Sequence, residues 1–109
     1  MYTAVIVGCG TIAGLYDDIG TTDSIVSHAA GYRNHDMFDL SGCVDCNKKT
    51  VERFAELQKV IHFDTNLVTV LDAVQPDIIS IATPDDTHYS IVSLILGCVD
   101  VPPKLIFLE

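Results

Sequence analysis

The sequence predicts an α/β fold, a doubly wound parallel sheet of about five strands with helices on both faces. Short apolar runs alternate with stretches of helical periodicity along the 109 residues, as happens when helical crossovers join parallel strands. The first apolar run leads directly into a glycine-rich turn, Gly8-Cys9-Gly10-Thr11-Ile12-Ala13. A strand that enters such a turn typically opens a sheet of this kind.

The N-terminal part begins with an apolar strand at Tyr2–Val7. After the glycine turn, Gly14–Asp23 has no period and carries two glycines and three acidic residues. We interpret it as an inserted surface loop, with a lid over a ligand as the alternative. The helix is expected to resume over Ser27–Tyr32, and a second strand is expected at Leu40–Val44.

The rest of the chain continues the alternation of helix and strand. Apolar residues at helical spacing predict helices at Lys48–Leu57, Leu67–Val74 and Thr87–Leu96. Further strands are predicted at Val60–Phe63, Asp77–Ala82 and Leu105–Leu108. Pro76 and Gly97 are expected to end the second and third of these helices.

Composition places the chain in a broad class. Residues 1–109 are predicted to form one domain, and the 49% hydrophobic content suits parallel strands with both faces buried. No apolar run approaches the ~18 residues of a membrane span. The sequence has no basic start followed by a long apolar stretch, so we expect no secretory signal and a cytoplasmic location. The net charge of −9 repels phosphate backbones and makes nucleic acid an improbable partner.

Cysteine and histidine give little support for metal or redox chemistry. Cys43-Val44-Asp45-Cys46 forms a C-x-x-C motif at the end of a predicted strand, with no second ligand pair. We interpret the cysteines as buried or half-buried thiols, with a redox pair or zinc ligands as the alternative. His28, His35 and His62 have no partners at ligand spacing, so no metal site is expected.

The glycine turn predicts a dinucleotide site. Gly8 permits the tight turn, Gly10 lets the backbone approach a pyrophosphate, and Ala13 keeps the following helix close to the strand. The amides near Thr11 and Ile12 would face phosphate oxygens at the positive end of that helix. The alternative is a glycine turn that holds no ligand.

Asp45 ends the second predicted strand, where a carboxylate can accept both hydroxyls of an adenosine ribose. Because this charge would repel a 2′-phosphate, we expect NAD rather than NADP, although Lys48 and Lys49 weaken the preference. The alternative is a surface aspartate that caps the helix beginning at Lys48.

The segment from Thr83 to His88 follows a predicted strand and opens a helix at the carboxyl edge of the sheet, where ligands bind in this architecture. Asp85 or Asp86 is expected to cap the helix. His88 lies in the first helical turn, within reach of a nicotinamide ribose or as a half-exposed histidine; both interpretations stay open.

Taken together, the chain resembles the N-terminal, Rossmann-type domain of the Gfo/Idh/MocA oxidoreductases. The resemblance is carried by five motifs in order: Val7-Gly8-Cys9-Gly10-Thr11-Ile12-Ala13, His28-Ala29-Ala30-Gly31-Tyr32-Arg33, Val44-Asp45-Cys46-Asn47, Ile81-Ala82-Thr83-Pro84-Asp85-Asp86-Thr87-His88-Tyr89 and Phe107-Leu108-Glu109. It implies NAD(P)-dependent hydride transfer at a hydroxyl of a sugar, nucleotide-sugar or cyclitol.

The resemblance also implies roles for single residues. Ala82, Thr83, Pro84 and His88 would lie near the middle and nicotinamide side of the cofactor. Glu109 matches the Glu of the family's Glu-Lys-Pro motif. The Lys, the last strand and the substrate domain of the family fold would follow Glu109, so we expect these 109 residues to bind cofactor without catalysing.

Two alternative functions stay open. One is a non-catalytic nucleotide-binding or redox-sensing module, which reports NADH or binds a nucleotide such as coenzyme A. The other is assembly into a homo-oligomer, driven by an unpaired last strand and an exposed apolar sheet face.

Overall fold

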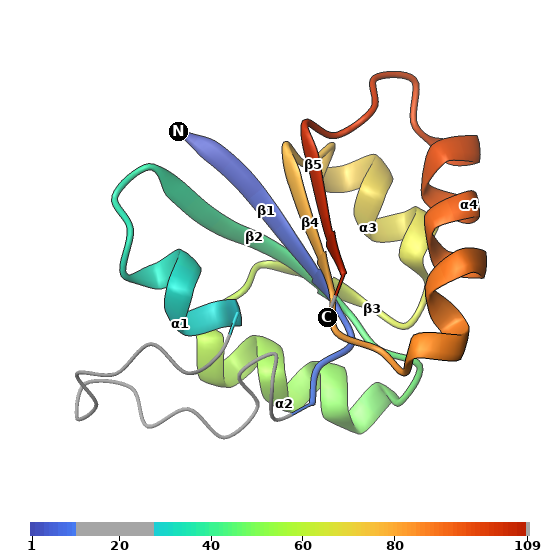
Figure 1. Cartoon of the computed structure of the whole chain (residues 1–109). Helices are drawn as coiled ribbons and strands as arrows, with labels where there is room; N and C mark the ends of the chain where they lie inside the picture. The colour runs from blue at the N-terminus through green and yellow to red at the C-terminus, as the bar shows by residue number, and fades with distance from the viewer. Residues whose placement is uncertain (11–27, 109) are drawn as a thin grey trace.

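In the computed structural model, residues 1–10 and 28–108 are described, and they contain a five-stranded parallel sheet of order β3-β2-β1-β4-β5 (Figure 1). The strands are β1 (Tyr2–Val7), β2 (Phe38–Val44), β3 (His62–Asp64), β4 (Ile78–Ile81) and β5 (Leu105–Leu108). The helices are α1 (His28–Arg33), α2 (Lys48–Gln58), α3 (Leu67–Val74) and α4 (His88–Cys98), with a 3-10 turn at Asp85–Thr87.

Helices cover both faces of this sheet, which confirms the predicted doubly wound architecture. Helices α1 and α2 lie on one face, and α3 and α4 lie on the other (Figure 1). Alternate residues of β1 point to opposite faces, so Ile6 packs with Phe54 of α2 whereas Val5 packs with Leu71 of α3 and Ile95 of α4. Both cores therefore meet at the central strand.

Two connections place helices against the sheet. One leads from β2 to α2, and the other leads from β3 to α3. Asn47 and Asn66 cap the two helices, as their side chains accept backbone N–H groups of the first turn. Helix α3 packs closely, because a Cβ added to Gly42 of β2 would lie 2.8 Å from Val70 Cγ1. The absence of a side chain at Gly42 thus sets how near α3 approaches the sheet.

Several boundaries differ from the sequence prediction. Strand β2 begins at Phe38, because Phe38 pairs with Tyr2 of β1. The prediction that β3 starts at Val60 is wrong, since the Val60 N–H donates to Ala55 O and closes the end of α2. The prediction that Gly97 stops α4 is also wrong, because the helix continues to Cys98 and the chain turns extended only at Val99.

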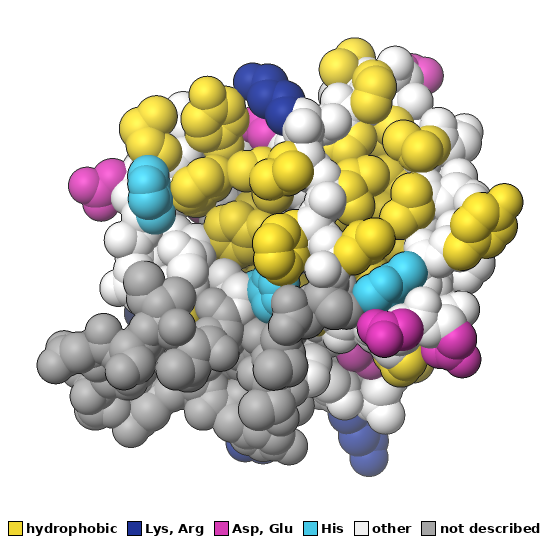
Figure 2. All heavy atoms as spheres, viewed as in Figure 1, with side chains coloured by type: hydrophobic (Ala, Val, Ile, Leu, Met, Phe, Trp, Pro, Cys, Tyr) yellow, Lys and Arg dark blue, Asp and Glu magenta, His cyan; other side chains and the backbone are white. Residues whose placement is uncertain are grey.

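An apolar surface lies over the edge of the sheet. Strand β5 pairs only with β4 among the described strands, and Leu105 and Phe107 are about half exposed. Figure 2 shows hydrophobic side chains gathered on this face. The homo-oligomer that this face would favour stays a prediction. Within the described residues, no helix has the length and apolarity needed to cross a membrane.

The interpretation of Gly14–Asp23 as an inserted loop, or as a lid, falls outside the described residues. Ser27, which was expected to begin the helix now seen as α1, lies there as well.

Candidate functional site

A groove of about 800 Å³ opens at the carboxyl edge of the sheet. Its wall is built by the turn after β1, the end of β2, the start of α3, the loop after β4 and one side of α4. The predicted site residues that the groove brings together are Gly8, Gly10, Asp45, Ala82, Thr83 and Pro84. Thr11, Ile12, Ala13 and Glu109 lie outside the described residues.

Gly8 is required by the fold itself. Its φ is +93°, a conformation that side chains rarely adopt. A Cβ at this position would lie 2.6 Å from the carbonyl oxygen of Ala82. The Gly8 N–H donates to Val44 O at 2.7 Å. The turn is therefore packed tightly between β2 and the loop after β4.

Gly10 is different. Apart from Gly10 itself and its neighbours in the chain, no described atom lies within 4 Å of where its Cβ would stand, and its φ lies outside the left-handed region. Neither packing nor backbone conformation among the described residues therefore requires glycine at this position. The open space beside Gly10 belongs to the groove, as expected where a ligand approaches the backbone closely.

Cys9 anchors the turn between these two glycines. Its side chain is fully buried, its N–H donates to Asp45 Oδ2 at 2.9 Å, and its Sγ donates to Val44 O at 3.5 Å. The neighbouring Cys43 thiol and burial together raise the pKa of the Cys9 thiol far above its usual range. Cys9 therefore stays a neutral thiol, as expected for a buried cysteine.

Asp45 is held by two backbone groups. Oδ2 accepts the Cys9 N–H, and Oδ1 accepts the Asn47 N–H at 2.8 Å. The alternative in which Asp45 caps α2 is wrong, because the capping side chain is Asn47, which accepts the Thr50 N–H at 3.0 Å. The carboxylate instead joins the glycine turn to the end of β2, at the wall of the groove.

The loop after β4 forms the opposite wall. The Ala82 N–H donates to Val7 O at 2.8 Å, which continues the ladder past the end of the strand. The Thr87 hydroxyl lies 2.6 Å from Thr83 Oγ1 and 2.6 Å from the Pro84 carbonyl oxygen. His88 Nε2 lies 3.1 Å from Thr83 O. Side chains of the helix start thus brace this loop.

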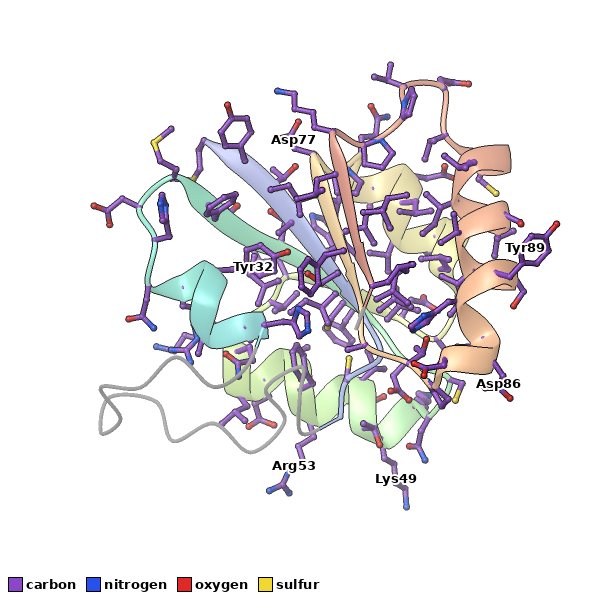
Figure 3. All side chains as sticks on the ribbon, in the orientation of Figure 1. Tyr32, Lys49, Arg53, Asp77, Asp86 and Tyr89 are labelled. Atoms are coloured by element: carbon purple, nitrogen blue, oxygen red, sulfur yellow. The ribbon has the colours of Figure 1, made fainter. Side chains whose placement is uncertain are left out.

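The structure places His88 as a half-buried residue beside this loop and corrects the expected helix cap. His88 does not line the groove; it contacts the backbone of Thr83. The expected cap from Asp85 or Asp86 is wrong, because both belong to a 3-10 turn and the N-cap residue of α4 is Thr87. In Figure 3, Asp86 points outward from the start of α4.

Sequence reasoning missed other residues that line the groove, namely Cys46, Thr65, Asn66, Leu67, Thr87, Ile91 and Leu94. Most come from the first turns of α3 and α4 and the connections before them. One signal was available: Asp64-Thr65-Asn66 after β3 repeats the pattern of Asp45-Cys46-Asn47 after β2. The apolar residues of α4 give no such signal, because the packing of the helix decides which of them face the groove.

The charges around the groove favour backbone contacts to an anion. No Lys or Arg is among the described residues that line it, and Asp45 is its charged member. Lys48 lines a separate, open hollow beside α2 together with Phe63 and Thr65. Lys49 and Arg53 point away from the sheet (Figure 3). A phosphate in the groove would therefore meet amide groups rather than cationic side chains.

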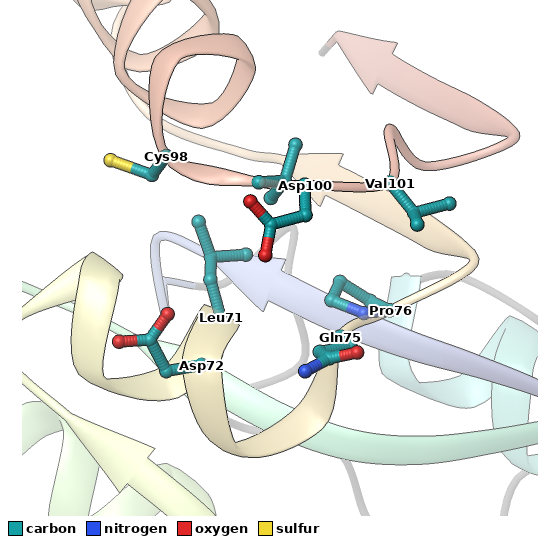
Figure 4. A pocket seen from close by; sticks show the side chains of 8 residues that line it. Leu71, Asp72, Gln75, Pro76, Cys98, Asp100 and Val101 are labelled. Carbon is teal, nitrogen blue, oxygen red and sulfur yellow. The ribbon is translucent and has the colours of Figure 1, made fainter.

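A second hollow lies near the ends of α3 and α4, remote from the glycine turn (Figure 4). It is lined by Leu71, Asp72, Gln75 and Pro76 on one side and by Cys98, Val99, Asp100 and Val101 on the other. Its volume is about 50 Å³, well below the ~300 Å³ of a small ligand pocket. The groove, at about 800 Å³, is also larger than the open hollow beside α2, at about 380 Å³, and is therefore the candidate site.

Comparison with known proteins identifies the family of this chain. Residues 2–98 match the sequence profile of the oxidoreductase family with an NAD-binding Rossmann fold, GFO_IDH_MocA. No curated protein is a significant match.

Solved structures share the fold. Myo-inositol 2-dehydrogenase from Lactobacillus plantarum superposes with a TM-score of 0.71 at 19% identity, over 99% of this chain and 27% of its own. GenD2 from gentamicin A biosynthesis, solved in complex with NAD, gives a TM-score of 0.69 at 22% identity, over 89% of this chain and 24% of its own.

A third solved structure is an oxidoreductase from Agrobacterium radiobacter in complex with NAD+, L-tartaric acid and magnesium, with a TM-score of 0.65 and 13% identity. It is matched over 88% of this chain and 25% of its own. The chain thus spans about a quarter of the length of the solved structures it matches. With most of its residues matched by the family profile, the chain belongs to the Gfo/Idh/MocA oxidoreductase family and corresponds to its NAD-binding Rossmann domain.

Proposed function

We propose that this chain binds NAD in the groove at the carboxyl edge of its sheet, as the nucleotide-binding domain of an oxidoreductase. The observation that carries the proposal is the pair of glycines at the turn after β1. Gly8 is required by the fold, whereas Gly10 leaves open space that no described atom fills. An open position next to an anchored turn is what a pyrophosphate needs to approach the backbone.

The residues of the groove suit this ligand. The amides of the glycine turn, which include Thr11 and Ile12 in the proposal, would hold the pyrophosphate, with Ala13 allowing the close helix. Asp45 would accept the ribose hydroxyls and disfavour the 2′-phosphate of NADP. The apolar side chains of Leu67, Ile91 and Leu94 would face the adenosine half.

On the other side, the loop Ala82-Thr83-Pro84 would lie near the middle of the cofactor. His88 would support it through Thr83 O. Glu109, by its match to the family's Glu-Lys-Pro motif, would contact the cofactor as well. In a protein as long as the solved structures that share the fold, NAD would exchange a hydride with a hydroxyl-bearing carbon of a sugar, nucleotide-sugar or cyclitol. For these 109 residues alone we expect binding without turnover.

The test is a thermal unfolding titration with NADH, NADPH and coenzyme A on three proteins: the unchanged chain, Gly10→Ala and Gly97→Ala. A ligand at 100 times its dissociation constant adds about 2.7 kcal/mol to stability, which raises the melting temperature of a domain this size by roughly 10–20 °C. Gly97 is the matched control, because it also has open space at its Cβ but lies in α4.

We expect NADH to stabilise the unchanged chain and Gly97→Ala, and to leave Gly10→Ala unaffected although that variant folds normally. Gly97→Ala should itself be no less stable than the unchanged chain, because Gly97 lies in the last turn of α4 with open space at its Cβ and alanine favours a helix more than glycine does. If NADH still stabilises Gly10→Ala, the groove is not the site. Stabilisation by coenzyme A alone would favour the binding module of another nucleotide.

A further inference from the structure

Two connections in this fold share one local design. After β2 the chain reads Asp45-Cys46-Asn47, and after β3 it reads Asp64-Thr65-Asn66. In each, the aspartate Oδ1 accepts the N–H of the asparagine two residues later at 2.8 Å, and the asparagine caps the next helix. One carboxylate oxygen is therefore enough for the local role of either aspartate.

Asp45 makes a second contact for which Asp64 has no counterpart among the described residues. Its other oxygen crosses 36 positions of sequence to accept the Cys9 N–H at 2.9 Å. Among the described residues, the hydrogen bonds of Asp64 stay within its own connection. The two aspartates thus differ in one respect, the bond to the glycine turn.

That bond restrains the backbone of Cys9, at the point where the tightly packed Gly8 gives way to the open position of Gly10. Cys9 stands between two glycines, and glycine accepts a wide range of backbone angles. Three hydrogen bonds hold the described start of the turn: Gly8 N–H to Val44 O, Cys9 N–H to Asp45, and Cys9 Sγ to Val44 O. The bond to Asp45 is the charge-assisted one, which makes it the strongest type of the three.

We propose that Asp45 is a positioning residue for the pyrophosphate: by holding the Cys9 amide it keeps the glycine turn in its binding conformation. The inference deepens the proposed function and rests on it, because it assigns to one carboxylate an effect on the phosphate part of the ligand as well as on the ribose. The two halves of the cofactor site are thereby coupled through Asp45.

The sign of the effect separates positioning from simple electrostatics. A carboxylate beside the turn repels a phosphate, so removing its charge alone would strengthen the binding of any phosphate ligand. Loss of a positioning bond would weaken it. A ligand without ribose isolates this effect, because the role of Asp45 at the ribose hydroxyls then drops out.

The experiment compares the unchanged chain, Asp45→Asn and the matched control Asp64→Asn. Bound NADH is displaced by inorganic pyrophosphate and followed by NADH fluorescence, which gives the affinity of both ligands. A single amide oxygen at position 45 cannot serve the N–H groups of both Cys9 and Asn47. We therefore expect pyrophosphate to bind Asp45→Asn about tenfold more weakly, the scale of a lost bond to a charged group, and Asp64→Asn as the unchanged chain does. Equal or tighter binding of pyrophosphate to Asp45→Asn overturns the proposal.

Hydrogen exchange of the Cys9 amide provides a readout that needs no ligand. We expect exchange to be about tenfold or more faster in Asp45→Asn than in Asp64→Asn or the unchanged chain; unchanged exchange overturns the proposal. If the unchanged chain binds neither NADH nor pyrophosphate, the proposed function fails, while the exchange rate still decides whether Asp45 holds the turn.

The unchanged chain provides a further measurement that does not depend on the folding of Asp45→Asn. The Cys9 amide of the unchanged chain, whose N–H donates to Asp45 Oδ2, should exchange at least about tenfold more slowly than an unstructured amide. Exchange at the rate of an unstructured amide also contradicts the proposal.

Discussion

Gly8→Ala is the substitution whose cost can be worked out most directly from this structure. The new methyl group would lie 2.6 Å from Ala82 O, 2.8 Å from Ala82 C and 2.9 Å from Thr83 Cγ2. Two of these atoms belong to the backbone and cannot rotate away, so overpacking costs about 1–3 kcal/mol. The φ of +93° adds about 1–3 kcal/mol for a residue with a side chain. The sum is about 2–6 kcal/mol, a large part of the 5–15 kcal/mol that typically stabilises a domain.

Urea unfolding followed by circular dichroism measures this loss as a shift in midpoint at constant slope. Adding Thr83→Ser to Gly8→Ala removes the Thr83 Cγ2 atom. This second substitution should restore little of the lost stability, because the shortest contacts of the new methyl group are to Ala82. Gly10→Ala is the matched control and should change the free energy of unfolding by less than about 0.5 kcal/mol. A loss below about 1 kcal/mol for Gly8→Ala would show that the turn is not packed as described.

The remaining predictions concern the packing and the thiols. Gly42→Ala should destabilise by about 1–3 kcal/mol, and part of that loss should disappear when Val70→Ala is added, which a double-mutant cycle of urea midpoints measures. The buried Cys9 thiol keeps its proton in the folded state, whereas the same thiol in the unfolded chain loses its proton above about pH 9. The free energy of unfolding should therefore fall by about 1.4 kcal/mol for each pH unit above about pH 9. The slope should be shallower in Cys9→Ala, as measured by urea unfolding at pH 8, 9 and 10. The expectation of a buried or half-buried thiol is wrong for Cys46, which is exposed. Cys46 should react with a thiol reagent at pH 8 well before Cys9 does, and equal rates would contradict the burial described.

Elements bounded by strong local signals were predicted with their observed ends. Strand β1 runs over Tyr2–Val7 and helix α3 over Leu67–Val74, as the sequence indicates. The helix begins after the capping Asn66 and ends at Gln75, which adopts the left-handed conformation ahead of Pro76. Capping and helix-breaking residues act on neighbours within a few positions, so these helix ends can be predicted from the sequence alone.

Elements whose ends depend on a partner were predicted less well. Strand β3 begins later than predicted, because the Val60 N–H still donates to Ala55 O at the end of α2. Lys59 adopts the left-handed conformation there, a conformation that usually falls on glycine or asparagine and so gave no signal in the sequence. Strand β2 begins earlier because β1 lies beside it and pairs with Phe38. These ends follow from neighbours that are distant in sequence.

The sequence by itself determined the order of strands and helices, the glycine turn and the carboxylate at the end of the second strand, because each depends on residue types within a short stretch. Only the tertiary structure decided that Asp45 bonds the amide of Cys9, that Gly8 is required by the loop after β4 while Gly10 faces open space, and that His88 contacts Thr83 O instead of lining the groove. The physical reason is that these contacts join segments separated by many residues or depend on how a helix is rotated against the sheet, and short-range periodicity carries no information on either.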